Sequence, residues 1–173
     1  MRLFRSSEVL GIAADALDFA REASRETHPN EYMGFLRGED ASRFDLDRSG
    51  TVITEVLIVP GTRSDETSAT VDSSMIPNDR RAVGSIHSHP NGVLRPSDAD
   101  LDTFGQGTVH IILGHPYGPT DWAAFDQYGD PRDLEVLDVD LPDPEEFFDF
   151  TEADLDVEYD AGRPRRGAEG GDR

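Results

Sequence analysis

The six residues from Val109 to Gly114 constrain the fold most, because they read Val-His-Ile-Ile-Leu-Gly with three aliphatic residues in a row. Successive side chains of a strand point to opposite faces, so a run of this kind is typical of a strand buried on both faces. A sheet covered in this way packs against further layers of secondary structure. The segment therefore favours a layered α/β domain.

The remaining pattern agrees with that fold class. Apolar residues from Ser6 to about Thr27 recur at helical spacing, with Ser6 or Ser7 as a candidate N-cap, and His28-Pro29 ends the predicted helix. A second, shorter helix is predicted at 97–104. We therefore predict an α/β fold with a mixed β-sheet flanked by helices. The other predicted strands are 32–36 (ended by Gly38-Glu39-Asp40), 51–59, 68–73, 82–89, 122–128 and 134–139, with a polar loop at 61–66.

The charge of the chain limits the classes of function. There are 36 acidic residues against 16 basic ones, for a formal net charge of −20. Such a surface repels phosphate backbones, so no nucleic-acid partner is expected. No apolar run is long enough to span a membrane and no signal peptide is recognisable, so we expect a cytoplasmic protein without a membrane partner. The acidity, with no lysine at all, suits a salt-rich cytoplasm and is interpreted as a property of the organism.

Two short fragments carry the candidate chemistry. His87 and His89 lie two apart in a predicted strand, so their side chains share one face. Ser97 and Asp100 lie three apart after a proline, which is the spacing of a capped helix start but also brings both side chains to one side of a turn. The chain has no cysteine, so a metal would be held by His and carboxylates. The fragments are thus either a strand end and a helix cap, or a metal site with an open position.

Together the fragments resemble the signature of the JAMM (JAB/MPN+) metalloproteases, in which His-x-His is followed by seven residues and Ser-x-x-Asp. This chain has His87 and His89, then 90–96, then Ser97 and Asp100. The family also carries an upstream Glu-x-x-Gly-hydrophobic-hydrophobic-x-Gly pattern, which 31–38 matches. The resemblance covers about residues 1–141, and the acidic, cysteine-free and lysine-free composition is similar to that of haloarchaeal, desampylase-type members.

The resemblance implies a fold and a set of residue roles. The fold would be the JAB/MPN architecture, which is cytidine-deaminase-like. His87, His89 and Asp100 would bind Zn2+. Glu31 would act as general base and then as general acid, and Ser97 would donate a hydrogen bond to the oxyanion.

The resemblance also implies a reaction. It is hydrolysis of the amide bond between the C-terminal glycine of a ubiquitin-like modifier, of the small archaeal (SAMP) type, and a lysine of its target. Two alternatives are retained: a related hydrolase that processes the C-terminus of a sulfur-carrier protein or a small adduct, and a non-catalytic scaffold of the same fold. A zinc nucleobase deaminase is disfavoured, because such enzymes need a cysteine pair.

The domain organisation is predicted from composition. We expect one domain at 1–141 and an acidic, disordered tail at 142–173, since nine of the nineteen residues in 142–160 are acidic. The segment from Ser64 to Val71 is the candidate edge for pairing with the extended tail of a modifier. Of the remaining histidines, His28 is expected at a helix end, His110 in the core with its polar atoms satisfied, and His115 in a loop near the cleft.

Overall fold

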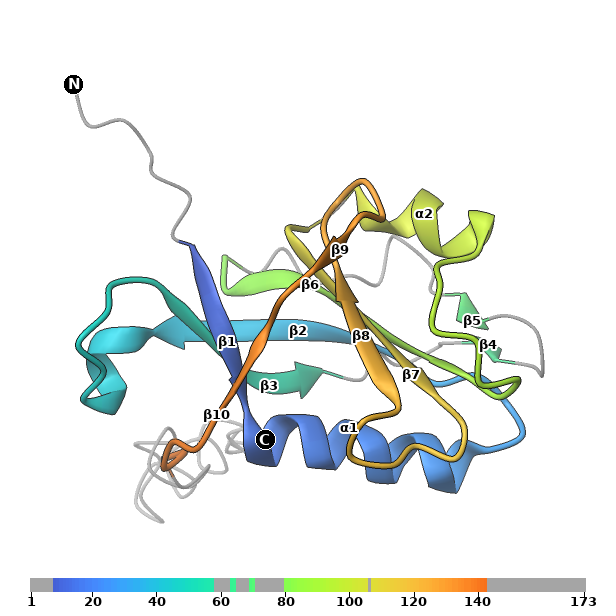
Figure 1. The fold of residues 1–173 in the computed structure, drawn as a ribbon, viewed down its shortest axis with the longest axis horizontal. Coiled ribbons are helices and arrows are strands. Elements are labelled where there is room, and N and C mark those ends of the chain that lie inside the picture. Colours follow the sequence, from blue (N-terminus) through green and yellow to red (C-terminus); the bar gives the residue numbers. More distant parts are fainter. Residues whose placement is uncertain (1–7, 58–62, 65–68, 71–79, 106, 143–173) are drawn as a thin grey trace, which may run out of the picture. The chain divides into compact units, whose positions relative to one another are not determined.

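The computed structural model describes residues 8–57, 63–64, 69–70, 80–105 and 107–142. Eight strands form one mixed sheet in the order β10-β1-β3-β2-β6-β7-β8-β9, and β4 and β5 form a separate pair (Figure 1). The mixed α/β sheet predicted from the sequence is confirmed. The elements are β1 Val9–Ala13, α1 Ala14–Thr27, β2 Met33–Asp40, the 3-10 helix Ala41–Phe44, β3 Thr51–Leu57, β4 Arg63–Ser64, β5 Ala69–Thr70, β6 Ala82–His89, α2 Asp98–Phe104, β7 Val109–Gly114, β8 Trp122–Phe125, β9 Pro131–Arg132 and β10 Glu135–Leu137.

Strand β6 lies inside the large sheet and is paired along both edges. It runs antiparallel to β2 and parallel to β7. Gly84 is needed for the second pairing, because a Cβ at this position would lie 1.6 Å from the carbonyl oxygen of Val109. The backbone that carries His87 and His89 is therefore held by two ladders of hydrogen bonds.

The two helices pack on opposite faces of the sheet. Leu17 of α1 belongs to the same buried cluster as Ile111 of β7, whereas Phe104 of α2 belongs to a cluster with Ile112. Adjacent residues of one strand point to opposite faces, so the two helices cover different sides. All six residues of β7 are buried, as the aliphatic run predicts.

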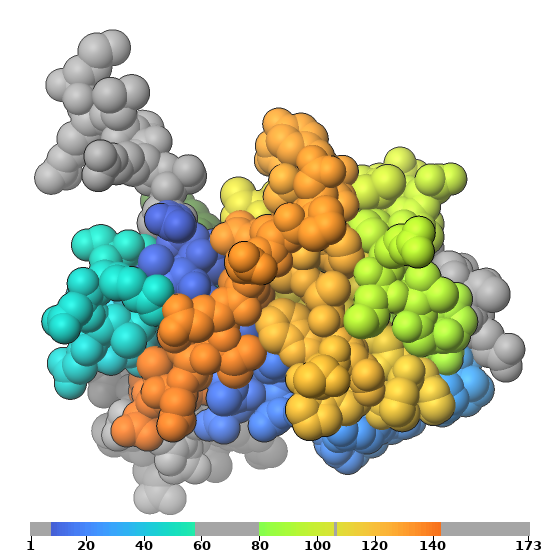
Figure 2. Space-filling model, viewed as in Figure 1, coloured from blue at the N-terminus to red at the C-terminus, as the bar shows by residue number. Residues whose placement is uncertain are grey.

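The turn between β8 and β9 lies beside α2. A Cβ at Gly129 would come within 2.4 Å of the Leu101 side chain, which shows how closely the turn approaches the helix. The space-filling view shows the chain from β8 to β10 next to the segment that includes α2 (Figure 2). Helix α2 is thus enclosed between the sheet and this turn.

The long N-terminal helix predicted at 6–27 is wrong in its first part. Residues Val9 to Ala13 form β1, which pairs in parallel with both β3 and β10. The helix begins at Ala14, and its N-cap, Ala13, makes no side-chain capping bond. The candidate caps Ser6 and Ser7 lie outside the described residues.

The predicted end of the strand at 32–36 is also wrong. Strand β2 continues through Gly38 to Asp40, with a bulge between Arg37 and Gly38 that keeps it paired with β3. A bulge absorbs one extra residue without ending the ladder.

The remaining differences are at element ends. The strand predicted at 122–128 ends at Phe125, and β9 was not predicted. β4 falls in the predicted loop 61–66, while 58–59 and most of 68–73 lie outside the described residues. The predicted tail also lies outside the described residues, except for Pro142. The boundary at 141 therefore stays a prediction. Within the described part of the chain, no helix is long and apolar enough to cross a membrane.

Candidate metal centre

His87 and His89 project from the same face of β6, as the strand period predicts. Both side chains are buried, with 2% and 6% of the residue surface exposed. Their neighbours across the parallel ladder are Ile112 and Gly114 of β7. This is the face that α2 covers, because Ile112 packs with Phe104.

Asp100 comes to the histidines through the cap of α2. Ser97 is the N-cap, its hydroxyl accepts a hydrogen bond from the backbone N–H of Asp100, and the Asp100 carboxylate accepts from the backbone N–H of Ser97. This reciprocal pair is a capping box, so the helix-cap interpretation of Ser-x-x-Asp is correct. It also turns the buried Asp100 side chain towards β6.

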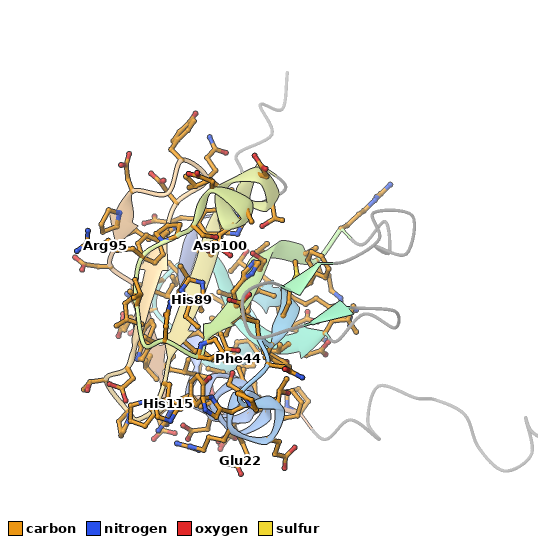
Figure 3. All side chains as sticks on the ribbon, turned by 90° about the vertical axis from the view of Figure 1, so that its right-hand side faces the viewer. Glu22, Phe44, His89, Arg95, Asp100 and His115 are labelled. Carbon is orange, nitrogen blue, oxygen red and sulfur yellow. The ribbon has the colours of Figure 1, made fainter. Side chains whose placement is uncertain are left out.

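The carboxylate contacts both imidazoles. Asp100 Oδ1 lies 3.2 Å from His87 Nδ1, and Oδ2 lies 3.1 Å from His89 Nε2. His89 and Asp100 lie close together near the centre of the side view, on β6 and α2 (Figure 3). The capping box and the histidine cluster therefore share one carboxylate, and the two sequence interpretations describe the same turn.

The second nitrogen of His89 fixes the orientation of its ring. His89 Nδ1 donates a hydrogen bond of 2.7 Å to the carbonyl oxygen of Val93. In a neutral His89 the proton therefore resides on Nδ1 and Nε2 is the nitrogen that can bind a metal. A charged His89 also donates from Nε2 to Asp100. A ring nitrogen anchored to a carbonyl is the usual partner arrangement of a metal-binding histidine.

Burial and mutual contact shift the three ionisable groups. Burial lowers the pKa of His87 to about 4, against the opposing attraction of Asp100. Burial acts against ionised Asp100, but hydrogen bonds from His89 and Ser97 outweigh it and bring the pKa of the carboxyl to about 2. Burial also opposes the charge of His89, and its bonds to Asp100 and Val93 overcome this and raise its pKa. At neutral pH the cluster combines a neutral His87 with an ionised Asp100.

Glu31 lies next to this cluster because of the pairing between β2 and β6. Met33 is opposite His87 in the antiparallel register, and the N–H of Ser88 bonds to the carbonyl of Tyr32. Glu31 precedes this ladder by two residues, next to the end of β6 where His89 lies. The negative charge of Glu31 contributes to the raised pKa of His89, in agreement with this position.

The donor set fits zinc. Nitrogen about 2.0–2.1 Å and oxygen about 2.0–2.2 Å from a tetrahedral ion are roughly 3.3 Å apart, close to the 3.1–3.2 Å between the imidazole nitrogens and the carboxylate oxygens. Among the described residues, no three His, Cys, Asp or Glu side chains surround a common metal position. The fit thus rests on donor type, ring orientation and these distances.

The two serines near the cluster differ in placement. Ser97 is exposed, and its hydroxyl donates a 2.8 Å hydrogen bond to Asp100 Oδ2. Its predicted role as oxyanion donor stays a prediction. Ser88 is on the opposite face of β6, where its hydroxyl accepts a 2.6 Å hydrogen bond from the N–H of Tyr32. Ser88 thus fixes the backbone next to Glu31.

The other histidines fall into two groups. His28 and His115 are exposed, and their rings stack with centroids 4.5 Å apart. His110 is buried in β7, and its Nδ1 lies 2.8 Å from the hydroxyl of Ser85. Its Nε2 has no hydrogen-bond partner among the described residues, so the prediction of satisfied polar atoms is wrong for this nitrogen. Sequence reasoning did not connect Ser85 or His110 with the cluster. The available signal was that Ser85 continues the His-x-His alternation by one step along the same face.

Fold and cluster together define a prokaryotic JAB-type domain. The chain belongs to the family of prokaryotic homologs of the JAB domain, whose pattern matches residues 13–127. Its sequence is 73% identical over 160 residues to a protein from Haloferax volcanii described as a probable metalloprotease. That match covers 92% of this chain and 99% of the relative.

Solved structures give the same family. One, described as a JAMM metalloprotease-like zinc site in the proteasome and signalosome, is 25% identical with a TM-score of 0.54, covering 76% of this chain and 100% of its own. A JAB1/MPN domain protein from Archaeoglobus fulgidus is 27% identical with a TM-score of 0.56, covering 75% of this chain and 100% of its own. The JAMM resemblance and the JAB/MPN architecture expected from the sequence are confirmed.

Proposed function

We propose that this JAMM-type metalloprotease homologue is a zinc-dependent isopeptidase that removes a ubiquitin-like modifier from target lysines. The observation that carries the proposal is the position of Glu31, which precedes the β2–β6 ladder by two residues and acts electrostatically on His89. A metalloprotease needs a metal-ligand set and an adjacent base, and the pairing of β2 with β6 supplies both from segments far apart in the chain. The relative from Haloferax volcanii, described as a probable metalloprotease, supports the hydrolase class.

Each residue has a task in amide hydrolysis. His87, His89 and Asp100 would hold the ion, which would supply Lewis-acid polarisation of the scissile carbonyl and a more acidic water. The Glu31 carboxylate accepts a proton from the attacking water and then delivers it to the amine of the leaving lysine. Ser97, which is exposed beside the cluster, donates a hydrogen bond from its hydroxyl to the carbonyl oxygen as negative charge develops.

The proposed substrate is a modifier of the small archaeal type, conjugated through its C-terminal glycine. An extended tail of this kind pairs with a strand edge. The candidate edge, 64–71, lies outside the described residues except for Ser64 and Ala69–Thr70, so its role stays a proposal. We place the reaction in the cytoplasm, since the acidic, lysine-free and cysteine-free composition suits a salt-rich cell interior. A processing enzyme for a sulfur-carrier protein would use the same residues and differs only in the group released.

The test uses the full chain, loaded with zinc, and modifier conjugates from a salt-loving archaeon. Wild type is expected to release free modifier, a chelator to stop the release, and added zinc to restore it. Glu31→Gln is expected to lower the rate by about 10²–10⁴-fold, the usual contribution of a general base, while still binding zinc. Glu26→Gln is the matched control, because Glu26 is exposed on α1 and away from the cluster.

Two results would contradict the proposal. Conjugate cleavage that continues in the chelator shows that no metal is needed, and unchanged activity in Glu31→Gln removes this residue from the mechanism. Cleavage of a small adduct or a peptide extension, without release from conjugates, would instead identify the sulfur-carrier alternative.

A further inference from the structure

A buried chain of hydrogen bonds continues from His87 away from Asp100. While His87 Nδ1 faces Asp100, its Nε2 lies 3.1 Å from the hydroxyl oxygen of Ser85. The same oxygen lies 2.8 Å from Nδ1 of His110. Ser85 and His110 are direct register partners on β6 and β7, with 2% and 1% of their surface exposed. The chain is therefore fixed by the central strands of the sheet.

If the Ser85 hydroxyl donates to one imidazole and accepts from the other, the chain has two directions. In one direction His87 Nε2–H donates to Ser85, the Ser85 hydroxyl donates to His110 Nδ1, and His87 Nδ1 is bare. In the other, His110 donates to Ser85, Ser85 donates to His87 Nε2, and His87 must carry its proton on Nδ1. A ring nitrogen that carries a proton cannot bind a metal, so only the first direction makes Nδ1 a ligand.

Phe104 holds this chain in place and shields it. Its ring stacks on His110 with centroids 4.0 Å apart and planes 8° apart, and meets His87 edge-on at 6.2 Å. Phe104 is fully buried, so the stack keeps both imidazoles in fixed orientations. Burial lowers the pKa of His110, against the opposing effect of the backbone of Gly107 and Phe104. A neutral His110 is suited to accept the hydroxyl proton of Ser85.

We propose that Ser85 and His110 are positioning residues that hold His87 with its proton on Nε2, so that Nδ1 is presented to the metal. The inference deepens the proposed function, on which it rests for the identity of the ion. It assigns a task to two residues that touch neither the ion nor the substrate. The corresponding partner of His89 is the carbonyl of Val93, so each histidine has one nitrogen anchored by its surroundings and the other facing Asp100.

The test measures zinc affinity of the full-length protein by competition with a chromophoric chelator. Ser85→Ala is expected to weaken zinc binding by about 10–100-fold, the usual effect of removing such a partner. His110→Phe keeps the stack on Phe104 but removes the acceptor, and is expected to weaken binding less than Ser85→Ala does. The double variant is expected to match Ser85→Ala alone, because both residues act through one hydroxyl.

The control is Thr54→Val. Thr54 is a buried polar residue of β3, and its replacement removes a strand hydroxyl away from the cluster. A variant that only loosened the sheet would lower the unfolding temperature without a selective effect on zinc. Nitrogen NMR of the zinc-loaded wild type is expected to show His87 protonated at Nε2, and this proton signal is expected to exchange faster with water in Ser85→Ala.

The outcomes separate the two proposals. A loss of less than tenfold in Ser85→Ala, additive losses in the double variant, or a His87 proton on Nδ1 would overturn the inference. If Ser85→Ala does not fold, His110→Phe takes its place: a zinc affinity below that of wild type supports the inference, and an unchanged affinity overturns it. Wild type that binds zinc but releases no modifier would refute the proposed function and leave the inference intact, whereas wild type that binds no zinc would refute both.

Discussion

Asp100 is at once a capping residue and a candidate ligand, and the two tasks can be separated by substitution. Asp100→Ala removes every oxygen of the side chain. Asp100→Asn keeps one oxygen that can still accept the hydrogen bond from the Ser97 N–H, which is 2.7 Å from the carboxylate in the structure. We therefore expect the Asn variant to keep much of the cap and to lose the charge that attracts the ion.

The magnitudes follow from the contacts. In Asp100→Ala the helix loses half of its capping box, which costs about 1 kcal/mol. The buried imidazoles of His87 and His89 lose their shared acceptor, at about 1–3 kcal/mol for a buried group left without a partner. The sum is about 2–4 kcal/mol, or roughly 8–16 °C in unfolding temperature at about 4 °C per kcal/mol for a domain of this size. Asp100→Asn is expected to lose about half as much.

The assay pairs thermal unfolding of the metal-free variants with zinc affinity measured by chelator competition. Zinc affinity is expected to fall by more than 100-fold in both variants, because an ion with three protein ligands loses its only charged one. Asp98→Asn is the control. Asp98 is exposed in the same first turn, so this substitution removes a charge without changing the histidines. Zinc affinity within threefold of wild type in either Asp100 variant would show that Asp100 is only a cap.

Three further predictions test the fold around the site. Gly84→Ala is expected to lower the free energy of unfolding by at least about 3 kcal/mol in chemical denaturation, because its Cβ would meet the Val109 carbonyl, and an unchanged midpoint would disprove the tight contact. The pKa of His87 is about 4 in the folded chain, below its ordinary value of 6.5. As the pH falls, His87 is therefore protonated in the unfolded chain before it is protonated in the folded chain. Metal-free protein is expected to lose stability as the pH falls from about 6.5 to 4. The raised pKa of His89 changes stability in the opposite direction. The comparison is therefore with His87→Gln, whose stability is expected to depend less steeply on pH. Removal of 143–173 is expected to leave the conjugate-cleaving rate and the unfolding temperature unchanged, whereas a fall in both would make the tail part of the domain.

The start of the first helix shows where sequence patterns fail. Val9 and Ala13 are four apart and Leu17 is four further on, so one helical stripe runs through what is in fact a strand followed by a helix. The junction between Ala13 and Ala14 has no Gly, Pro or capping side chain to reveal it. Gly11 in the middle of the segment was the available signal, because a glycine weakens a helix and permits close approach between strands.

The candidate site was more accessible to prediction, for a local reason. The His87 and His89 alternation and the Ser97–Asp100 cap are each encoded within four residues, so their geometry follows from one strand and one turn. The choice of Glu31 depended on a resemblance to a family pattern, and its place near His89 depends on the β2–β6 register. The link between Ser85 and His110 depends on the β6–β7 register, which no local pattern contains.

The candidate ligands lie on elements that are held by different numbers of backbone hydrogen bonds. His87 and His89 end a strand that is hydrogen-bonded along both edges, whereas Asp100 lies on a helix of seven residues. Local opening is easiest where few backbone bonds must break, so α2 is expected to open far more often than β6. Exchange of the ion would then be limited by the frequency with which α2 opens, and variants that stiffen this helix would slow metal release without altering the two histidines.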